Sequence, residues 1–270
     1  MLTVVTSSDL LRTICAYQVG VYDICREPWV AKQWARTKAA DLGASSSFHR
    51  DSWGISAFEY DLFHFQVHFG PWYACHGVDG AKRLVACKPA LLSWVLDHSV
   101  RHGDANLLAA LPANTYTTPT MINVAAYYGH LRVLQLLMGN QAPGFSSAAV
   151  HAAAYRGHMH VVQWLVARGV RYAETYTCLL GGTFTVDAMG FAAEAGHLDV
   201  VMYLFGVQTL RNVSLAINKA AVQGHVHVFD FLYRATRHVC STNALEFAQR
   251  RGHTELLAYL AAHHIEARDQ

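Results

Sequence analysis

Residues 151–165 read HAAAYRGHMHVVQWL, and the order of residue types in this stretch decides the fold. Small alanines precede a Gly-His pair at 157–158, and bulky apolar residues follow it at positions that share one side of a helix. Glycine readily adopts the left-handed backbone conformation in which many helices end. The stretch therefore predicts a helix of small residues, a tight turn at Gly157 and a second, amphipathic helix.

The Gly-His pair recurs along the chain, which identifies a repeat. Successive pairs are 28, 39, 28 and 28 residues apart, and a leucine stands eight residues after every glycine. A degenerate sixth copy surrounds Gly103. Because such units bury their apolar faces against one another, we predict an all-α fold, an α-solenoid of stacked helix-turn-helix repeats over residues 99–270. The five pairs lie at 129–130, 157–158, 196–197, 224–225 and 252–253.

The repeated pattern Ala-Ala-x-x-Gly-His-Leu-x-Val-Val-x-x-Leu resembles the centre of the ankyrin repeat, and the resemblance extends over about residues 99–262. Ankyrin units have about 33 residues, whereas the spacing here is 28, and the Thr-Pro-Leu-His opening survives only at 118–121 as Thr-Pro-Thr-Met. The resemblance implies a scaffold that binds a protein partner along a concave face. The shortened units lose most of the β-hairpin that projects between ankyrin units, which argues against binding through the tips of these hairpins.

The longest spacing, between Gly157 and Gly196, contains 11 extra residues. Within it, β-prone residues flank Gly181-Gly182, a pattern typical of a hairpin. We therefore expect a hairpin insertion at residues 172–186, which is either a functional element or a drifting surface insertion.

Residues 1–98 show no repeat and are expected to form an N-terminal helical region. Over residues 5–36, a Leu-Leu-x-x-Ile helix, a short turn and a Cys-Arg-x-x-Trp segment are similar to an F-box, a helical module that docks onto an adaptor of ubiquitin ligases. The usual Leu-Pro lead-in is absent, and Pro28 lies inside the second segment. The alternative is a helical cap over the first repeat, because a solenoid needs its end faces covered.

The ankyrin resemblance also implies where a partner binds. In ankyrin-like units the two residues before the glycine lie at the exposed end of the first helix and point into the concave groove. These positions vary in size and charge here, as a recognition surface would, and neutral drift on a solvent face would give the same variety. We expect the protein-binding residues to be Tyr127, Tyr128, Tyr155, Arg156, Glu194, Gln223, Arg250 and Arg251.

Two functions are consistent with these patterns. The preferred one is a non-enzymatic scaffold for protein–protein interaction. The alternative is an F-box-like substrate-recognition subunit of a ubiquitin ligase, in which the repeats choose the target and residues 5–36 bind the ligase adaptor.

Composition and motifs give no reason to expect catalysis, a cofactor, a metal or nucleic-acid binding. The 21 Lys and Arg nearly balance the 19 Asp and Glu, which leaves a formal charge of only +2. His64 and His68 are spaced as on one helix face, but Phe65 stands where a catalytic zinc helix has Glu. No Gly-rich phosphate loop, nucleophile elbow or dinucleotide fingerprint occurs.

The sequence also lacks the features expected of secreted and membrane proteins. It shows no secretory signal, no apolar run of membrane-spanning length and no Cys-x-x-Cys pair. We therefore expect an intracellular protein, cytoplasmic or nuclear, that does not enter a membrane and keeps its cysteines reduced.

Overall fold

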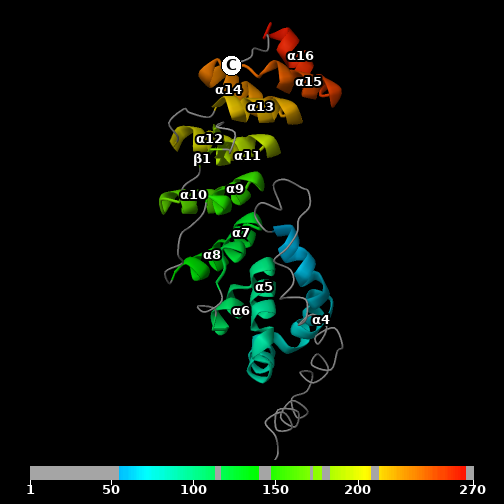
Figure 1. The fold of residues 1–270 in the computed structure, drawn as a ribbon, viewed down its shortest axis with the longest axis vertical. Helices are drawn as coiled ribbons and strands as arrows, with labels where there is room; N and C mark the ends of the chain where they lie inside the picture. Colours follow the sequence, from blue (N-terminus) through cyan, green and yellow to red (C-terminus); the bar gives the residue numbers. More distant parts are fainter. Residues whose placement is uncertain are drawn as a thin grey trace, which may run out of the picture. The chain divides into compact units, whose positions relative to one another are not determined.

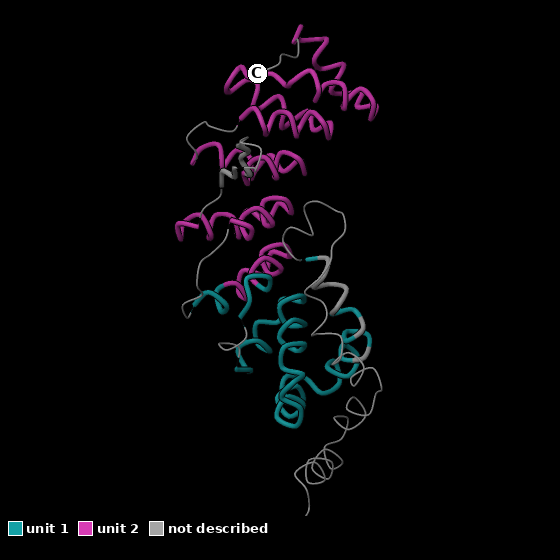
Figure 2. The backbone as a smooth tube through the Cα atoms, viewed as in Figure 1, with its two compact units in different colours: residues 1–121, 135–140 teal, residues 122–134, 141–270 magenta. Residues whose placement is uncertain are grey.

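The computed structural model describes residues 55–112, 117–139, 147–170, 173–177, 183–207 and 213–265 (Figure 1). The chain divides into two compact units, one comprising residues 1–121 and 135–140 and the other residues 122–134 and 141–270 (Figure 2). The F-box-like pattern at residues 5–36 lies outside the described residues.

The first unit is built from helices around an aromatic core. Within it lie α4 (Ile55–Cys87), the short 3₁₀ helix η1 (Pro89–Leu91), α5 (Leu92–His102) and α6 (Ala105–Ala110). Phe65 stacks on Phe69 with ring centroids 4.7 Å apart, and Trp94 of α5 lies 6.0 Å from Phe65. Since all three side chains are buried, aromatic packing holds α4 against α5.

Helices α5 and α6 reproduce the helix-glycine-helix layout of the sequence repeat. Gly103 ends α5 in the left-handed region at φ 73°, and Asp104 follows it as the N-cap of α6. The Asp104 Oδ1 atom accepts the backbone N–H of Leu107 at 2.9 Å. This bond satisfies one of the N–H groups that a helix start leaves unpaired.

Helix pairs joined by glycine turns make up the repeat region, and in each pair we name the first helix inner and the second outer. The turn glycines have φ between 73° and 81°. The inner helices α9, α11, α13 and α15 pack one on the next (Figure 1). Among the described residues the pairs are α7 (Pro119–Tyr127) with α8 (Leu131–Met138), α9 (Ala148–Tyr155) with α10 (Met159–Ala167), α11 (Ala188–Ala195) with α12 (Leu198–Val207), α13 (Val213–Gln223) with α14 (Val226–Thr236), and α15 (Thr242–Arg250) with α16 (Thr254–Ala262).

The buried positions explain why this sequence forms stacked pairs. Alanines of the inner helices, such as Ala153 and Ala193, are completely buried and let neighbouring helices approach closely. The leucine eight residues after each turn glycine is 0–7% exposed, and at Leu165, Leu204 and Leu232 it is fully buried. The all-α, ankyrin-like helical architecture expected from the sequence is confirmed.

Two short strands lie between α10 and α11. Strand β1 (Ala173–Thr177) pairs in antiparallel register with β2 (Thr183–Asp187), and Ala173 is opposite Asp187. Asp187 is also the N-cap of α11, where its Oδ1 atom accepts the backbone N–H of Met189 at 3.1 Å. One residue therefore ends the hairpin and starts an inner helix.

Replacing Asp187 with Ala is expected to reduce the free energy of unfolding by about 1 kcal/mol, because the cap bond of α11 is lost. Asp187→Asn keeps a side-chain oxygen at the same position and should retain most of the stability. Urea unfolding of the three proteins measures the difference. An equal loss in both variants would show that the cap bond is not what makes Asp187 stabilising.

Candidate protein-binding surface

The candidate surface is formed by the C-terminal ends of the inner helices, at the two positions before each turn glycine. Most of its side chains reach solvent. Arg156, Arg250 and Arg251 are exposed, and Tyr128, Tyr155, Glu194 and Gln223 are half-buried. We call these seven residues the inner-helix-end surface.

Tyr127 does not belong to this surface, so the expectation that it lies exposed is wrong. Its side chain is only 5% exposed. The ring of Tyr128 meets it edge-on at 5.1 Å, and the guanidinium of Arg156 lies 5.0 Å from its ring centroid. The large ring is covered from two sides, and it supports Arg156 rather than facing a partner.

Arg156 is the best-positioned cation of the surface. It is exposed, and within the described part of the chain no carboxylate pairs with it. Its contact with the Tyr127 ring is a cation–π interaction, which restricts the long side chain without neutralising its charge. The structure thus brings Tyr127, Tyr128 and Arg156 together from two successive helix pairs, and Tyr155 directly precedes Arg156.

Glu194 is engaged by a lysine that sequence analysis overlooked. The Lys219 ammonium lies 2.8 Å from a Glu194 carboxylate oxygen and 4.2 Å from the centroid of the Phe191 ring. Lys219 stands five residues before Gly224, where the other repeats have Val, Ala or Phe. A single charged residue at a position that is apolar in the other repeats was the signal that could have revealed it.

A second group of polar and aromatic side chains lies on α13 and α15. Arg251 donates to the Gln223 Oε1 atom at 2.6 Å and to the Val222 carbonyl at 3.2 Å. Arg250 forms a 3.5 Å ion pair with Glu246, and its guanidinium lies 5.9 Å from the ring of Phe247. Phe247, which is 50% exposed, was not predicted as a surface residue. The residues at the same position of three earlier repeats, Val124, Ala152 and Phe191, are buried.

The charge of the surface is therefore unevenly compensated. Lys219 and Arg250 each pair with a glutamate. Arg156 and Arg251 have no acidic partner within the described residues. Arg156 contacts an aromatic ring, and Arg251 donates to a backbone carbonyl and to a side-chain amide. Two ordered guanidinium groups whose charge is not compensated by a described carboxylate favour binding of carboxylate groups at this surface.

A family model described as ankyrin repeats (3 copies) matches residues 122–210. Residues 122–210 are ankyrin repeats. This span includes the β1–β2 hairpin, so the longer unit between Gly157 and Gly196 is part of the matched region. No curated protein matches the chain.

Four of the five histidines of the Gly-His pairs join their helix pair to the one before it. His158 Nε2 lies 3.0 Å from the Tyr127 carbonyl oxygen, and His197 Nε2 lies 3.1 Å from that of Tyr155. The same bond recurs after the matched span, from His225 to the Glu194 carbonyl and from His253 to the Val222 carbonyl, each at 3.0 Å. Each bond holds the backbone of a residue two positions before a turn glycine, so the inner-helix ends are fixed in place.

Other kinds of site find no support in the described part of the chain. No group of three or more His, Cys, Asp and Glu side chains there could hold a metal ion. The side chains of His64 and His68 lie outside the described ones. None of the described helices has the length and apolar character needed to cross a membrane.

Proposed function

We propose that this chain is a non-enzymatic scaffold that binds a protein partner through the inner-helix ends of its repeats. The observation that carries the proposal is the group formed by Tyr128, Tyr155 and Arg156 beside the buried Tyr127. Tyrosine and arginine are the residues that most often dominate binding energy at interfaces. Behind them the alanines of the inner helices are fully buried. The residues at the helix ends therefore differ from repeat to repeat, whereas the packing residues behind them stay the same.

Preorganisation supports the same proposal. Arg156 rests on the Tyr127 ring, and the backbone of Tyr127 is held by His158. A side chain that is already restricted loses less conformational entropy when a partner binds. Because Arg156 and Arg251 have no acidic partner among the described residues, the partner that fits best carries Asp or Glu side chains at the interface.

Replacing both Tyr128 and Tyr155 with Ala is expected to weaken partner binding by about 2 kcal/mol or more, because the partner loses its contacts with two aromatic side chains. The melting temperature should stay nearly unchanged. The partner is first captured by cross-linking to the full chain, and its affinity for each variant is then measured by titration calorimetry.

Met202→Ala is the matched control, since Met202 is 50% exposed on the outer helix α12 and should leave the affinity unchanged. A double variant that binds like the wild type, or that unfolds, would contradict the assignment of the surface.

The ubiquitin-ligase alternative rests on the sequence pattern at residues 5–36. In that case the chain should co-purify with a ligase adaptor, and a chain lacking residues 1–40 should not. If the chain is a scaffold and not a ligase subunit, the full chain should bind no such adaptor.

Part of the proposal is that the protein works in the cytoplasm or nucleus. Cys75 and Cys240 are free thiols, and free thiols persist in these reducing compartments.

A further inference from the structure

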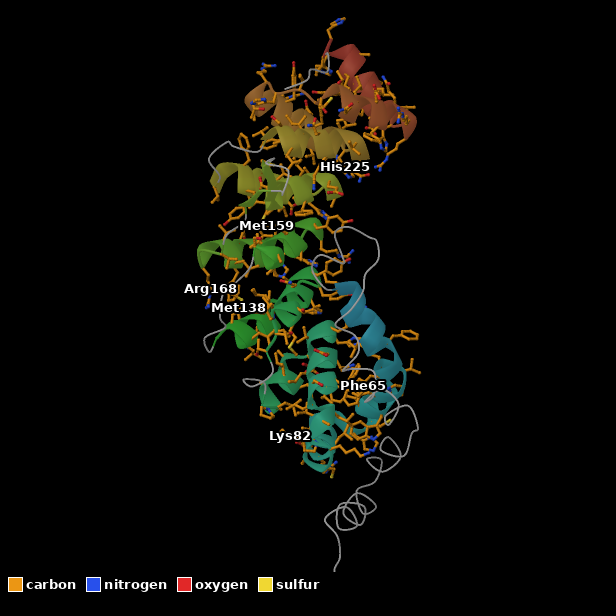
Figure 3. All side chains as sticks on the ribbon, viewed as in Figure 1. Phe65, Lys82, Met138, Met159, Arg168 and His225 are labelled. Atoms are coloured by element: carbon orange, nitrogen blue, oxygen red, sulfur yellow. The ribbon has the colours of Figure 1, made fainter. Side chains whose placement is uncertain are left out.

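A row of four imidazoles connects successive repeats of the second unit. We name His158, His197, His225 and His253 the histidine ladder. Each Nε2 atom lies 3.0–3.1 Å from a carbonyl oxygen of the preceding inner helix. Figure 3 labels His225, which is the N-cap residue of α14.

The geometry determines which nitrogen carries the hydrogen at neutral pH. A carbonyl oxygen can only accept a hydrogen bond, so the Nε2 atom must be the donor. In the neutral ring the Nδ1 atom then has no hydrogen. Each ladder histidine is therefore the Nε2–H tautomer.

The face of each ladder ring packs on the turn glycine of the preceding repeat. A Cβ atom added to Gly129 would lie 2.7 Å from the Nδ1 atom of His158, and one added to Gly196 would lie 2.7 Å from that of His225. The same approach occurs between Gly157 and His197 and between Gly224 and His253, each at 2.6 Å. The glycine backbone shields one face of each ring from water, and at His158 and His225 this burial disfavours the charged form of the imidazole.

The charges around the first ladder histidine oppose its protonation. His158 faces the cation Arg156 and the histidines His130 and His160, and it is the N-cap residue of α10, the positive end of a helix. Burial is the largest cause that lowers the pKa of His158, and only its bond to the Tyr127 carbonyl acts the other way.

His225 has the same kind of surroundings. It faces His197, His227 and His253, and burial again is the main cause that lowers its pKa, against the bond to the Glu194 carbonyl. The carboxylate of Glu194 is paired with Lys219. Two of the facing groups, His197 and His253, are themselves ladder histidines, and a positive charge on either lowers the pKa of His225.

We propose that the histidine ladder locks successive repeats together at neutral pH and that its joints at His158 and His225 loosen in mild acid. A group whose pKa is lower in the folded chain stabilises the fold fully above its unfolded pKa of about 6.5. That contribution is lost as the pH falls below about 6.5, because the unfolded chain takes up the proton first. Loosening would release the inner-helix ends, and hence a bound partner, a consequence that rests on the proposed function.

Hydrogen exchange of the full chain tests the lock without any partner. Exchange rates are expressed as protection factors, which correct for the intrinsic pH dependence of amide exchange. For the amides of α10 and α14 these factors should fall at least tenfold between pH 7.5 and pH 5.5. In the double variant His158→Gln with His225→Gln, the amide side chain can still donate to the carbonyl but does not titrate, so the fall should be less than threefold. His238→Gln with His264→Gln changes two exposed histidines outside the ladder and should behave like the wild type.

A measurement on the wild type covers the case in which the glutamine variant does not fold. Two-bond proton–nitrogen NMR spectra should show the ladder imidazoles as Nε2–H tautomers at pH 7.5, with titration midpoints for His158 and His225 below about 6.5. Nδ1–H tautomers, midpoints at or above that value, or an equal fall of protection in the glutamine variant would overturn the proposal. Since none of these readouts involves a partner, they are independent of whether the proposed binding function holds.

Discussion

Acidification from pH 6.5 to pH 4 is expected to remove about 3 kcal/mol from the free energy of unfolding of the first unit through His98 alone. His98 lies on α5 with 6% of its surface exposed, and no described residue forms a hydrogen bond with its Nδ1 atom. Its ring meets Phe69 edge-on at 4.8 Å and lies 4.4 Å from the ring of His102. Burial among these rings lowers the pKa of His98 from 6.5 to about 4, assisted by the charge of His102 and opposed by Asp104.

The direction of the effect follows from which state binds the proton first. In the unfolded chain His98 becomes protonated near pH 6.5, whereas in the folded chain the ring stays neutral down to about pH 4. The stabilisation is therefore fully present above pH 6.5 and disappears as the pH falls towards 4.

Urea unfolding between pH 7 and pH 4, compared for the wild type and His98→Phe, measures this contribution. Phenylalanine keeps an aromatic ring against Phe69 but does not titrate, so its stability should decline about 3 kcal/mol less over this range. Carboxylates that become protonated in acid affect both proteins equally and cancel in the comparison. Parallel declines would show that His98 is protonated as easily in the folded chain as in the unfolded one.

The helix pairs could be predicted from the sequence because their signals are local and repeated. A left-handed glycine, small residues before it and a leucine eight positions after it are each required by the packing of a single pair. Leu204 and Leu232 are completely buried, and Gly196 and Gly224 have the positive φ that the turn requires. Repetition made these signals visible despite the 39-residue spacing.

The binding surface was less predictable because exposure depends on the neighbouring repeat. Tyr127 and Tyr155 occupy equivalent sequence positions, yet Tyr127 is buried and Tyr155 is half-buried. One of the groups that cover Tyr127 is Arg156, which belongs to the next repeat. Lys219 was overlooked for the same reason, since its partners Phe191 and Glu194 lie more than 20 residues earlier in the chain.

The Gly-His signature also contains more information than a single turn shows. Within one repeat the glycine ends the inner helix and the histidine starts the outer one. Across two repeats the histidine ring of one covers the glycine of the other. The two residues of the signature therefore act on different neighbours, and glycine is required both by its backbone conformation and by the ring beside it.

Gly196→Ala is expected to cost roughly 2–5 kcal/mol of unfolding free energy, the sum of two penalties. At φ 81° an L side chain is strained by about 1–2 kcal/mol. The new Cβ would also lie 2.7 Å from Nδ1 and 2.8 Å from Cε1 of His225. That ring cannot move aside without breaking its bond to the Glu194 carbonyl, so overpacking adds about 1–3 kcal/mol.

Gly252 provides the matched control, because it has nearly the same φ of 74° but no atom of the described residues within 4 Å of an added Cβ. Gly252→Ala should therefore show only the backbone strain of about 1–2 kcal/mol. Thermal and urea unfolding of both variants measure the difference, which isolates the contact with the ring. Adding His225→Ala to Gly196→Ala removes the obstructing ring, so the double variant should lose less stability than the two single changes added together. Equal costs at Gly196 and Gly252, or strictly additive changes in the double variant, would mean that His225 does not pack against the glycine of the preceding repeat.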